Sequence, residues 1–372
     1  MISGNNVLGI IFSNAYEDSV SELTAARAMG SVPFCGRYRL IDFPLSSMVN
    51  AGMDHVGVIT KSNYQSLMDH LGNGKPWDLS RKRKGLHILP PFNSSHSGVY
   101  RDRIQALSGI LGFIQQATEE YVLMCDCNVV SNMKLTELFR EHEQSGADIT
   151  IVCKHGVPPV LRDHINLELR EDGSVKQVYL SSVGGEECHY SLNAFLLRKS
   201  LLERLINNAV SLNQNSFERD IIQKYAGRLN MHGYVVREYA CTIDSLRSYY
   251  NHSMALLGSG QIDELFAPER PIYTKVRDDM PAMYGLGASA ANSLIADGCV
   301  IEGTVENSIL FRGVRVAKGA IVRNSIIMQG SFVGEDARLE CVITDKSVVI
   351  KPHKALCGAD DFPIYVGKRL VV

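Results

Sequence analysis

Residues 294–350 read LIADGCVIEGTVENSILFRGVRVAKGAIVRNSIIMQGSFVGEDARLECVITDKSVVI, and this stretch decides the architecture of the C-terminal part of the chain. Small aliphatic residues recur about every five to six positions, as pairs such as Ile309-Leu310 and Ile326-Ile327, with glycines between them. A hexapeptide period predicts a left-handed parallel β-helix, because each coil of that fold buries one aliphatic side chain per side. An antiparallel β-domain with short strands is the alternative, but its pattern would have period two.

Upstream of the repeats, strand and helix patterns alternate. Strands buried on both faces are predicted by four apolar runs: Val7–Phe12, His55–Thr60, Tyr121–Cys125 and Ile149–Cys153. Helical patterns occur at Ser21–Met29, Ser62–Leu71, Ile104–Ala117 and Leu135–Ser145. Further strands are predicted at Glu168–Leu180 and Tyr190–Leu197, and further helices at Leu201–Val210 and Phe217–Tyr225. The alternation indicates parallel β-α-β units and a doubly wound, Rossmann-like α/β domain.

The two patterns divide the chain of 372 residues into three segments. Residues 1–245 form the predicted α/β domain, and residues 286–372 form the predicted β-helix. Residues 246–285 begin with a helical pattern and continue with several prolines and little periodicity, as a helical linker would.

The composition excludes several classes of function. The net charge of −2 at pH 7 gives no reason to expect a nucleic-acid partner. Nine cysteines are scattered without a C-x-x-C pair, which is typical of a reducing compartment. No apolar stretch reaches the roughly 18 residues of a membrane span, and the first residues lack a secretory-signal pattern. We therefore expect a cytoplasmic protein that binds neither nucleic acid nor membranes.

A second informative stretch, residues 33–52, reads PFCGRYRLIDFPLSSMVNAG. His70–Gly74 (HLGNG), Pro76–Leu79 (PWDL) and Leu89–Pro91 (LPP) follow it in order. In these segments, and in its α/β and β-helix layout, the chain resembles the ADP-glucose pyrophosphorylase (glucose-1-phosphate adenylyltransferase) family over essentially its whole length. The resemblance implies a nucleotidyltransferase domain. The family joins glucose 1-phosphate to the α-phosphate of ATP, which requires a phosphate-binding loop and carboxylates that hold Mg²⁺.

The phosphate-binding loop expected after the first strand is missing. Where the family has G-G-x-G-x-R-L, this chain reads SNAYED at Ser13–Asp18, and no G-x-G occurs in residues 1–35. The resemblance places Asp18 where the family has its phosphate-binding arginine, with Glu17 beside it. Two carboxylates in place of a cation would repel a triphosphate.

The resemblance also places neutral side chains at both positions of the family's metal-binding carboxylates. Asn128 stands at the first position and Thr242 at the second, and neither offers a charge to a hard cation. This implies that no metal cofactor is bound, although the family uses Mg²⁺. Asp126 and Asp244 each lie two positions away, so the alternative is an active sugar-1-phosphate nucleotidyltransferase with displaced metal ligands.

A further change affects the expected nucleotide pocket, where bulky and charged residues at Asp102–Ala106 replace a family turn of small residues. Together these losses indicate a pseudo-enzyme and resemble the noncatalytic, GlgD-type branch of the family. That branch implies a regulatory subunit of ADP-glucose synthesis in glycogen biosynthesis. Its implied partner is a catalytic homologue in a hetero-oligomer, a tetramer. A hexapeptide acyltransferase is disfavoured because residues 253–352 contain no histidine that could act as the base.

Arg37, Tyr38 and Arg39 lie in the segment that best matches the family. The resemblance makes these residues candidates for binding a phosphorylated effector such as a sugar phosphate, because a basic residue at the Arg37 position binds activators in the family. Paired arginines also suit phosphate geometry. The alternative is that both arginines pair with carboxylates in a structural network.

Overall fold

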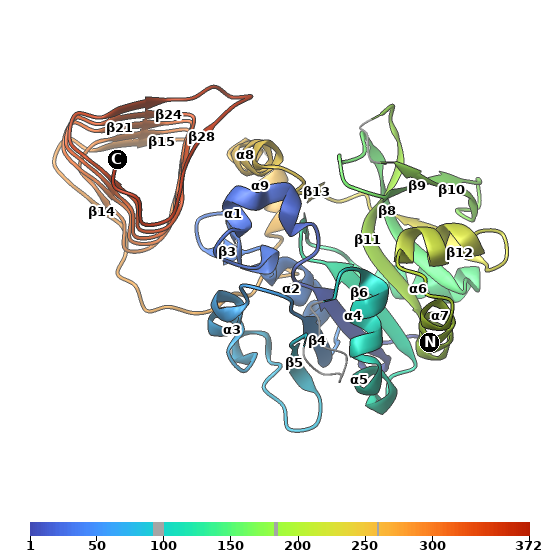
Figure 1. The fold of residues 1–372 in the computed structure, drawn as a ribbon. Helices are drawn as coiled ribbons and strands as arrows, with labels where there is room; N and C mark the ends of the chain where they lie inside the picture. The colour runs from blue at the N-terminus through green and yellow to red at the C-terminus, as the bar shows by residue number, and fades with distance from the viewer. Residues whose placement is uncertain (92–99, 182–184, 259) are drawn as a thin grey trace.

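The computed structural model describes residues 1–91, 100–181, 185–258 and 260–372. An N-terminal α/β domain lies beside a C-terminal stack of triangular coils, with helix α8 (Leu246–Ala255) between them (Figure 1). Across the described residues, no helix combines the length and the apolar character that crossing a membrane requires.

Nine strands of the described chain form the mixed sheet at the centre of the α/β domain: β1 (Val7–Phe12), β4 (His55–Ile59), β5 (Gly85–Leu89), β6 (Tyr121–Asp126), β8 (Ile149–Gly156), β9 (His164–Leu169), β10 (Val175–Ser181), β11 (Cys188–Arg198) and β12 (Met231–Val235). Strands β5, β4, β1 and β6 are adjacent in that order and parallel. Strand β11 runs antiparallel to β6 and β8, and β12 is parallel to β8. The parallel half is the part that the β-α-β pattern predicts.

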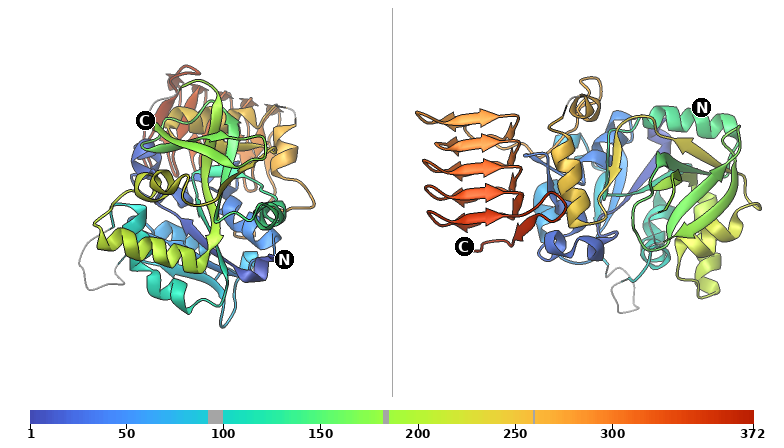
Figure 2. Two further views of the ribbon diagram at one scale, coloured as in Figure 1. Left: turned by 90° about the vertical axis from the view of Figure 1, so that its right-hand side faces the viewer. Right: turned by 90° about the horizontal axis from the view of Figure 1, so that it is seen from above.

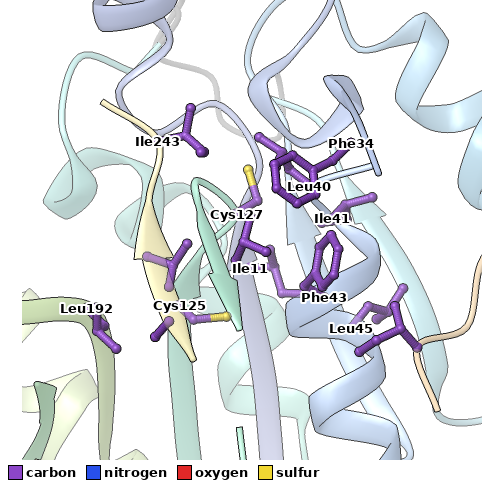
Figure 3. Close-up of a cluster of buried hydrophobic side chains, with 14 of the residues drawn as sticks. Ile11, Phe34, Leu40, Ile41, Phe43, Leu45, Cys125, Cys127, Leu192 and Ile243 are labelled. Atoms are coloured by element: carbon purple, nitrogen blue, oxygen red, sulfur yellow. The ribbon is translucent and has the colours of Figure 1, made fainter. Parts of the chain in front are cut away.

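Helices cover both faces of this sheet. Along β1, Val7 and Ile11 pack into one buried apolar cluster, whereas Leu8, Ile10 and Phe12 pack into another. The first cluster, part of which is drawn in Figure 3, includes side chains of α2 (Asp42–Asn50), α3 (Gln65–Leu71) and α6 (Leu135–Ser145). The second includes side chains of α4 (Arg103–Gly109), α5 (Leu111–Gln116), α7 (Lys199–Ser211) and the π-helix η5 (Phe217–Gln223). The doubly wound arrangement is therefore confirmed.

Three predicted elements differ from the structure. The pattern at Glu168–Leu180 is not one strand but parts of the antiparallel strands β9 and β10, because the chain turns at Gly173, whose φ is 79°. The helix predicted at Ser21–Met29 ends early, as α1 (Ser21–Thr24), and the Ala28 amide instead donates a hydrogen bond to the Asn63 carbonyl. The helix predicted at Ile104–Ala117 is divided at Ile110 into α4 and α5.

The C-terminal domain is the predicted left-handed parallel β-helix, built from three parallel sheets (Figure 2). The first sheet contains β14 (Met283–Tyr284), β17 (Val300–Ile301), β20 (Arg315–Val316), β23 (Phe332–Val333) and β26 (Val349–Ile350). The second contains β15 (Ser289–Ala291), β18 (Thr304–Glu306), β21 (Ile321–Arg323), β24 (Arg338–Glu340) and β27 (Ala355–Cys357). The third contains β16 (Leu294–Ile295), β19 (Ile309–Leu310), β22 (Ile326–Ile327), β25 (Val342–Thr344) and β28 (Ile364–Val366).

The third sheet packs against the α/β domain. Ile309, Ile326 and Ile343 from this sheet belong to the first apolar cluster of that domain. From α8, the Tyr249 hydroxyl donates to the Pro33 carbonyl (2.7 Å), and Tyr250 donates to the Asn324 carbonyl (2.6 Å). Buried apolar packing and these hydrogen bonds hold the two domains in a defined relative position.

Candidate functional site

A cleft of about 860 Å³ opens beyond the C-terminal end of β1. Its lining comes from residues 12–19, 100–105, 160–163 and 213–220, together with Lys61. Open α/β sheets bind ligands outside the carboxyl ends of their strands, and this volume lies within the range of about 300–1,000 Å³ typical of small-molecule sites. The cleft therefore occupies the place of a nucleotide site.

Side-chain hydrogen bonds, rather than a phosphate cradle, shape the loop after β1. Asn14 donates to the Glu17 carboxylate (2.7 Å) and accepts from the Lys61 amide (2.8 Å). Glu17 also lies 3.7 Å from the Lys61 ammonium group, so this nearby cation is already compensated. Asp18, which the resemblance places at the position of the family's phosphate-binding arginine, is exposed and lines the cleft. The loop thus presents acidic groups where a triphosphate would need cations.

A buried ion-pair network fills the inner wall of the cleft. The Arg103 guanidinium donates to Asp126 (2.9 Å) and lies 3.3 Å from the Glu218 carboxylate. The same guanidinium stacks 4.4 Å from the centre of the Phe12 ring. Burial lowers the pKa of Arg103, but the carboxylates of Asp126 and Glu218 raise it by more than burial lowers it. The net pKa therefore lies above the usual value, and the guanidinium is protonated.

Arg103 thereby compensates Asp126, one of the two carboxylates that lie two positions from the metal-binding positions that the resemblance implies. Asp126 is 1% exposed at the end of β6. Burial raises the pKa of its carboxyl group, and Arg103 offsets part of that effect. The Arg103 guanidinium neutralises the Asp126 carboxylate, as a bound metal cation would otherwise do.

Asn128 and Thr242, the two positions inferred separately for metal ligands, come together in the fold. The short strands β7 (Val129–Ser131) and β13 (Ala240–Thr242) pair, with Thr242 opposite Val129, and the Ile243 amide donates to the Asn128 carbonyl (2.8 Å). The Asn128 Oδ1 and Thr242 Oγ1 atoms are buried without a hydrogen-bond partner in the described structure. The fold thus brings the two positions together, and neither side chain carries a charge.

These residues do not fit Mg²⁺, which prefers carboxylate ligands. Both Asp244 oxygens are engaged, since Oδ2 accepts from the Val160 amide and Oδ1 accepts from Ser245 Oγ, each at 2.9 Å. Within the described residues, no group of three or more His, Cys, Asp or Glu side chains is placed to hold a metal ion.

A second, small cleft lies where the α/β domain meets the β-helix. Arg37, Tyr38 and Arg39 line it from the α/β domain. The other basic side chains that line this junction cleft are Lys275, Arg277, Arg312 and Lys346, with His70 beside them. The structure therefore gathers the three candidate effector residues with four cations that the sequence analysis did not single out.

The cations of the junction cleft are poorly compensated. Arg39 donates to the hydroxyl and main-chain carbonyl of Ser66, which are neutral acceptors. Of the six lysine and arginine side chains here, only Arg312 has carboxylate oxygens within 4 Å of its side-chain nitrogens among the described residues, at 3.9 Å from both Asp279 and Asp297. Asp42 lies beside Arg39 and accepts its main-chain amide at 3.0 Å, but neither Arg37 nor Arg39 forms a side-chain ion pair within 4 Å in the described part of the chain.

Burial, with a smaller contribution from neighbouring like charges, lowers the pKa of three cations in this cluster. Burial and the neighbouring Arg39 and Arg27 lower the pKa of Lys346 to about 7. Burial likewise lowers the pKa of Arg39 to about 10, and burial together with Arg37 lowers that of Arg312. An anion in the cleft would relieve this repulsion.

The residues that sequence reasoning missed are the ones that long-range folding brings in. Arg103 was noted only as a bulky replacement, and nothing local indicates that it meets Asp126. Lys275 and Arg277 lie in the linker, and Arg312 and Lys346 lie in different coils of the β-helix. Lys275 and Arg277, two basic residues close together in the linker, were the one feature of the sequence that could have indicated an anion-binding site there.

Comparison with known proteins agrees with this layout. Residues 10–159 match the family described as "Nucleotidyl transferase", and residues 281–361 match "GlmU-like, C-terminal hexapeptide". The chain is 37% identical to the glycogen biosynthesis protein GlgD of Bacillus subtilis, covering 99% of this chain and 97% of that protein. It is 38% identical to GlgD of Geobacillus stearothermophilus over 86% of this chain and 83% of that protein. It is 30% identical to glucose-1-phosphate adenylyltransferase of Clostridium beijerinckii over 99% and 96%.

Proposed function

Because the chain belongs to the glucose-1-phosphate adenylyltransferase (ADP-glucose pyrophosphorylase) family, we propose that it is a noncatalytic, regulatory subunit in glycogen biosynthesis. In this proposal a catalytic homologue makes ADP-glucose from ATP and glucose 1-phosphate, and the present chain joins it in a cytoplasmic hetero-oligomer, a tetramer. The similarity to two proteins named for glycogen biosynthesis supports the pathway.

One observation carries the noncatalytic part of the proposal: the buried Arg103–Asp126 ion pair inside the nucleotide cleft. Asp126, one of the two displaced carboxylates, is neutralised, and the two positions implied for metal ligands hold Asn128 and Thr242. Each lost electrostatic element of a transition-state site typically costs about 100- to 1,000-fold in rate. Losses at the loop and at both metal positions therefore leave the chain without useful turnover.

The test is pyrophosphate release by the purified chain with ATP, glucose 1-phosphate and Mg²⁺. We expect no turnover from the chain alone, and none from Asn128→Asp, because Glu17 and Asp18 still repel the triphosphate. Robust turnover by either protein would support the alternative, an active nucleotidyltransferase that uses Asp126 and Asp244. Adding the catalytic homologue from the same host should then produce activity whose effector response differs from that of the homologue alone.

We further propose that the junction cleft binds a phosphorylated effector, such as a sugar phosphate. The excess of cations over carboxylates at the cleft supports this assignment, since a phosphate group accepts several charge-assisted hydrogen bonds from arginine. The cleft also spans the two domains, with Arg37 and Arg39 on one side and Arg312 and Lys346 on the other. A bound anion would therefore couple the β-helix to the α/β domain.

Calorimetric titration of the chain with inorganic phosphate and with a sugar bisphosphate tests the effector site. Arg37→Ala should weaken binding at least about tenfold, because charge-assisted hydrogen bonds contribute about 1.5–3 kcal/mol each. Arg338→Ala, which removes an exposed arginine of β24 away from the cleft, is the matched control. Unchanged affinity in Arg37→Ala, or equal losses in both variants, would contradict the site.

A further inference from the structure

The charged side chains of the large cleft beyond β1 are balanced, and several of them pair with one another. Six carboxylates and five cations line this cleft, so their formal charges nearly cancel. Arg219 lies 3.1 Å from Asp163, and Lys61 lies 3.7 Å from Glu17. This balance distinguishes the large cleft from the junction cleft, where cations exceed carboxylates. The large cleft therefore has no charge to match a polyanion or a polycation.

Neutral amide groups of the same cleft are free to bind a ligand. Asn213, Gln214 and Asn215 follow one another along its lining. Across the described ranges of the chain, none of these three side chains forms a hydrogen bond with another residue. Each amide group can both donate and accept hydrogen bonds. A matching ligand therefore carries groups that also do both, and it needs no net charge.

A buried donor at the inner wall of the cleft is unused as well. The side chain of Arg103 is 7% exposed, and its Nη2 and Nε atoms lie against the carboxylates of Asp126 and Glu218. Its Nη1 atom is buried without a hydrogen-bond partner in the described structure. An unpaired buried donor costs free energy, and a ligand oxygen would remove that cost. Because two carboxylates already neutralise this cation, a neutral oxygen such as a hydroxyl is sufficient.

Two half-buried tyrosines, Tyr16 and Tyr100, add aromatic rings to the lining of the cleft. Tyr16 has a left-handed backbone conformation with a φ of 55°, which is uncommon for a bulky residue. Such conformations cluster at ligand-binding sites, where the surrounding structure holds them. Aromatic rings provide apolar contact area for the C–H groups of a ligand. The cleft thus combines apolar surfaces with neutral hydrogen-bonding groups.

We propose that this cleft binds a neutral saccharide, namely a short unphosphorylated chain of glucose units. Each sugar ring presents C–H groups on its faces, and its hydroxyl groups donate and accept hydrogen bonds at its edge. The volume of about 860 Å³ lies near the upper end of the range for small-molecule sites, which favours several linked rings over one. The choice of glucose rests on the proposed function in glycogen biosynthesis, whereas the preference for a neutral saccharide rests on the lining alone.

A nucleotide is the competing ligand, because a tyrosine ring could stack on its base. Its phosphates would lie against the acidic loop of Glu17 and Asp18, which repels them. A saccharide places no negative charge there, and its hydroxyl groups can instead donate hydrogen bonds to these carboxylates, which only accept. In the proposed hetero-oligomer, the saccharide in this cleft is a second regulatory ligand beside the anion of the junction cleft.

Calorimetric titration of the full chain with maltoheptaose, an oligosaccharide of glucose units, tests the site. We expect saturable binding with a dissociation constant below about 1 mM. Gln214→Ala/Asn215→Ala should weaken this binding about tenfold or more, because two neutral hydrogen bonds are lost. Gln144→Ala/Asn207→Ala is the matched control, since it removes an exposed glutamine and an exposed asparagine that do not line the cleft. Circular dichroism and the melting temperature establish that both double variants fold.

Competition titrations separate the large cleft from the junction cleft. Inorganic phosphate and adenosine should each fail to displace maltoheptaose, and Arg37→Ala should bind it as the unmodified chain does. A dissociation constant above about 1 mM, equal losses in the two double variants, or displacement by either competitor would overturn the saccharide site. These measurements do not involve pyrophosphate release. Failure here therefore leaves the noncatalytic role standing, whereas turnover by the chain alone would overturn that role and leave the binding result intact.

Discussion

The junction between the domains contains an ion pair whose removal should be costly. Arg27 donates to both oxygens of Asp345, at 2.6 and 2.8 Å, although the residues lie 318 positions apart. Their side chains are only 1% and 3% exposed. Asp345 also accepts from the Tyr365 hydroxyl at 2.8 Å. Asp345→Asn keeps the volume of this side chain and removes its charge.

The expected cost follows from burial. Removing one member of a buried ion pair leaves the other charge uncompensated and typically costs about 3–5 kcal/mol. The upper part of that range is expected here, because Arg39 and Lys346 lie close enough to repel Arg27 once Asp345 is gone. Removing both charges, in Arg27→Met/Asp345→Asn, should be less destabilising than the sum of the single changes by about 2 kcal/mol.

Urea denaturation followed by the fluorescence of Trp77, the one tryptophan, measures these differences. Arg323→Met is the matched control, because its partner Glu306 lies at 2.7 Å but both side chains are substantially exposed, and such surface pairs contribute below about 1 kcal/mol. If Asp345→Asn lost no more stability than Arg323→Met, or if the double variant showed strict additivity, the reasoning from burial would be refuted.

Three further outcomes are expected. The pKa of Lys346 is lowered to about 7, so its side chain is charged below that pH, whereas sulfate does not titrate near neutrality. The affinity of the chain for sulfate should therefore fall up to about tenfold from pH 6 to pH 8. Lys346→Met should abolish this decline, and the control variant Lys318→Met should keep it. Gly85→Ala should lower the melting midpoint markedly, because φ there is 101° and a Cβ atom would lie 2.3 Å from a carbonyl oxygen; Gly112→Ala, with open space in α5, should be neutral or stabilising by calorimetry. Tyr249→Phe should cost about 1–3 kcal/mol in urea denaturation by leaving a buried carbonyl unpaired, and a wild-type midpoint would contradict that hydrogen bond.

The sequence by itself determined the two kinds of architecture, because both rest on short-range patterns. The hexapeptide period predicts the β-helix, since each coil repeats the same requirement for a buried aliphatic side chain. Runs such as Val7–Phe12 predict buried strands for the same local reason. Prediction was wrong where a turn interrupts an apolar pattern, as at Gly173, because periodicity alone does not distinguish one long strand from a hairpin.

Only the tertiary structure decided how the charged groups are paired. The sequence shows that glycines and carboxylates are missing from the expected positions, but not that Arg103 reaches Asp126 inside the cleft. Arg39, from the start of the chain, and Lys346, from a late coil, meet only because the third sheet packs on the α/β domain. Such juxtapositions depend on burial and on distant backbone segments closing against each other, and neither is encoded in the spacing of neighbouring residues.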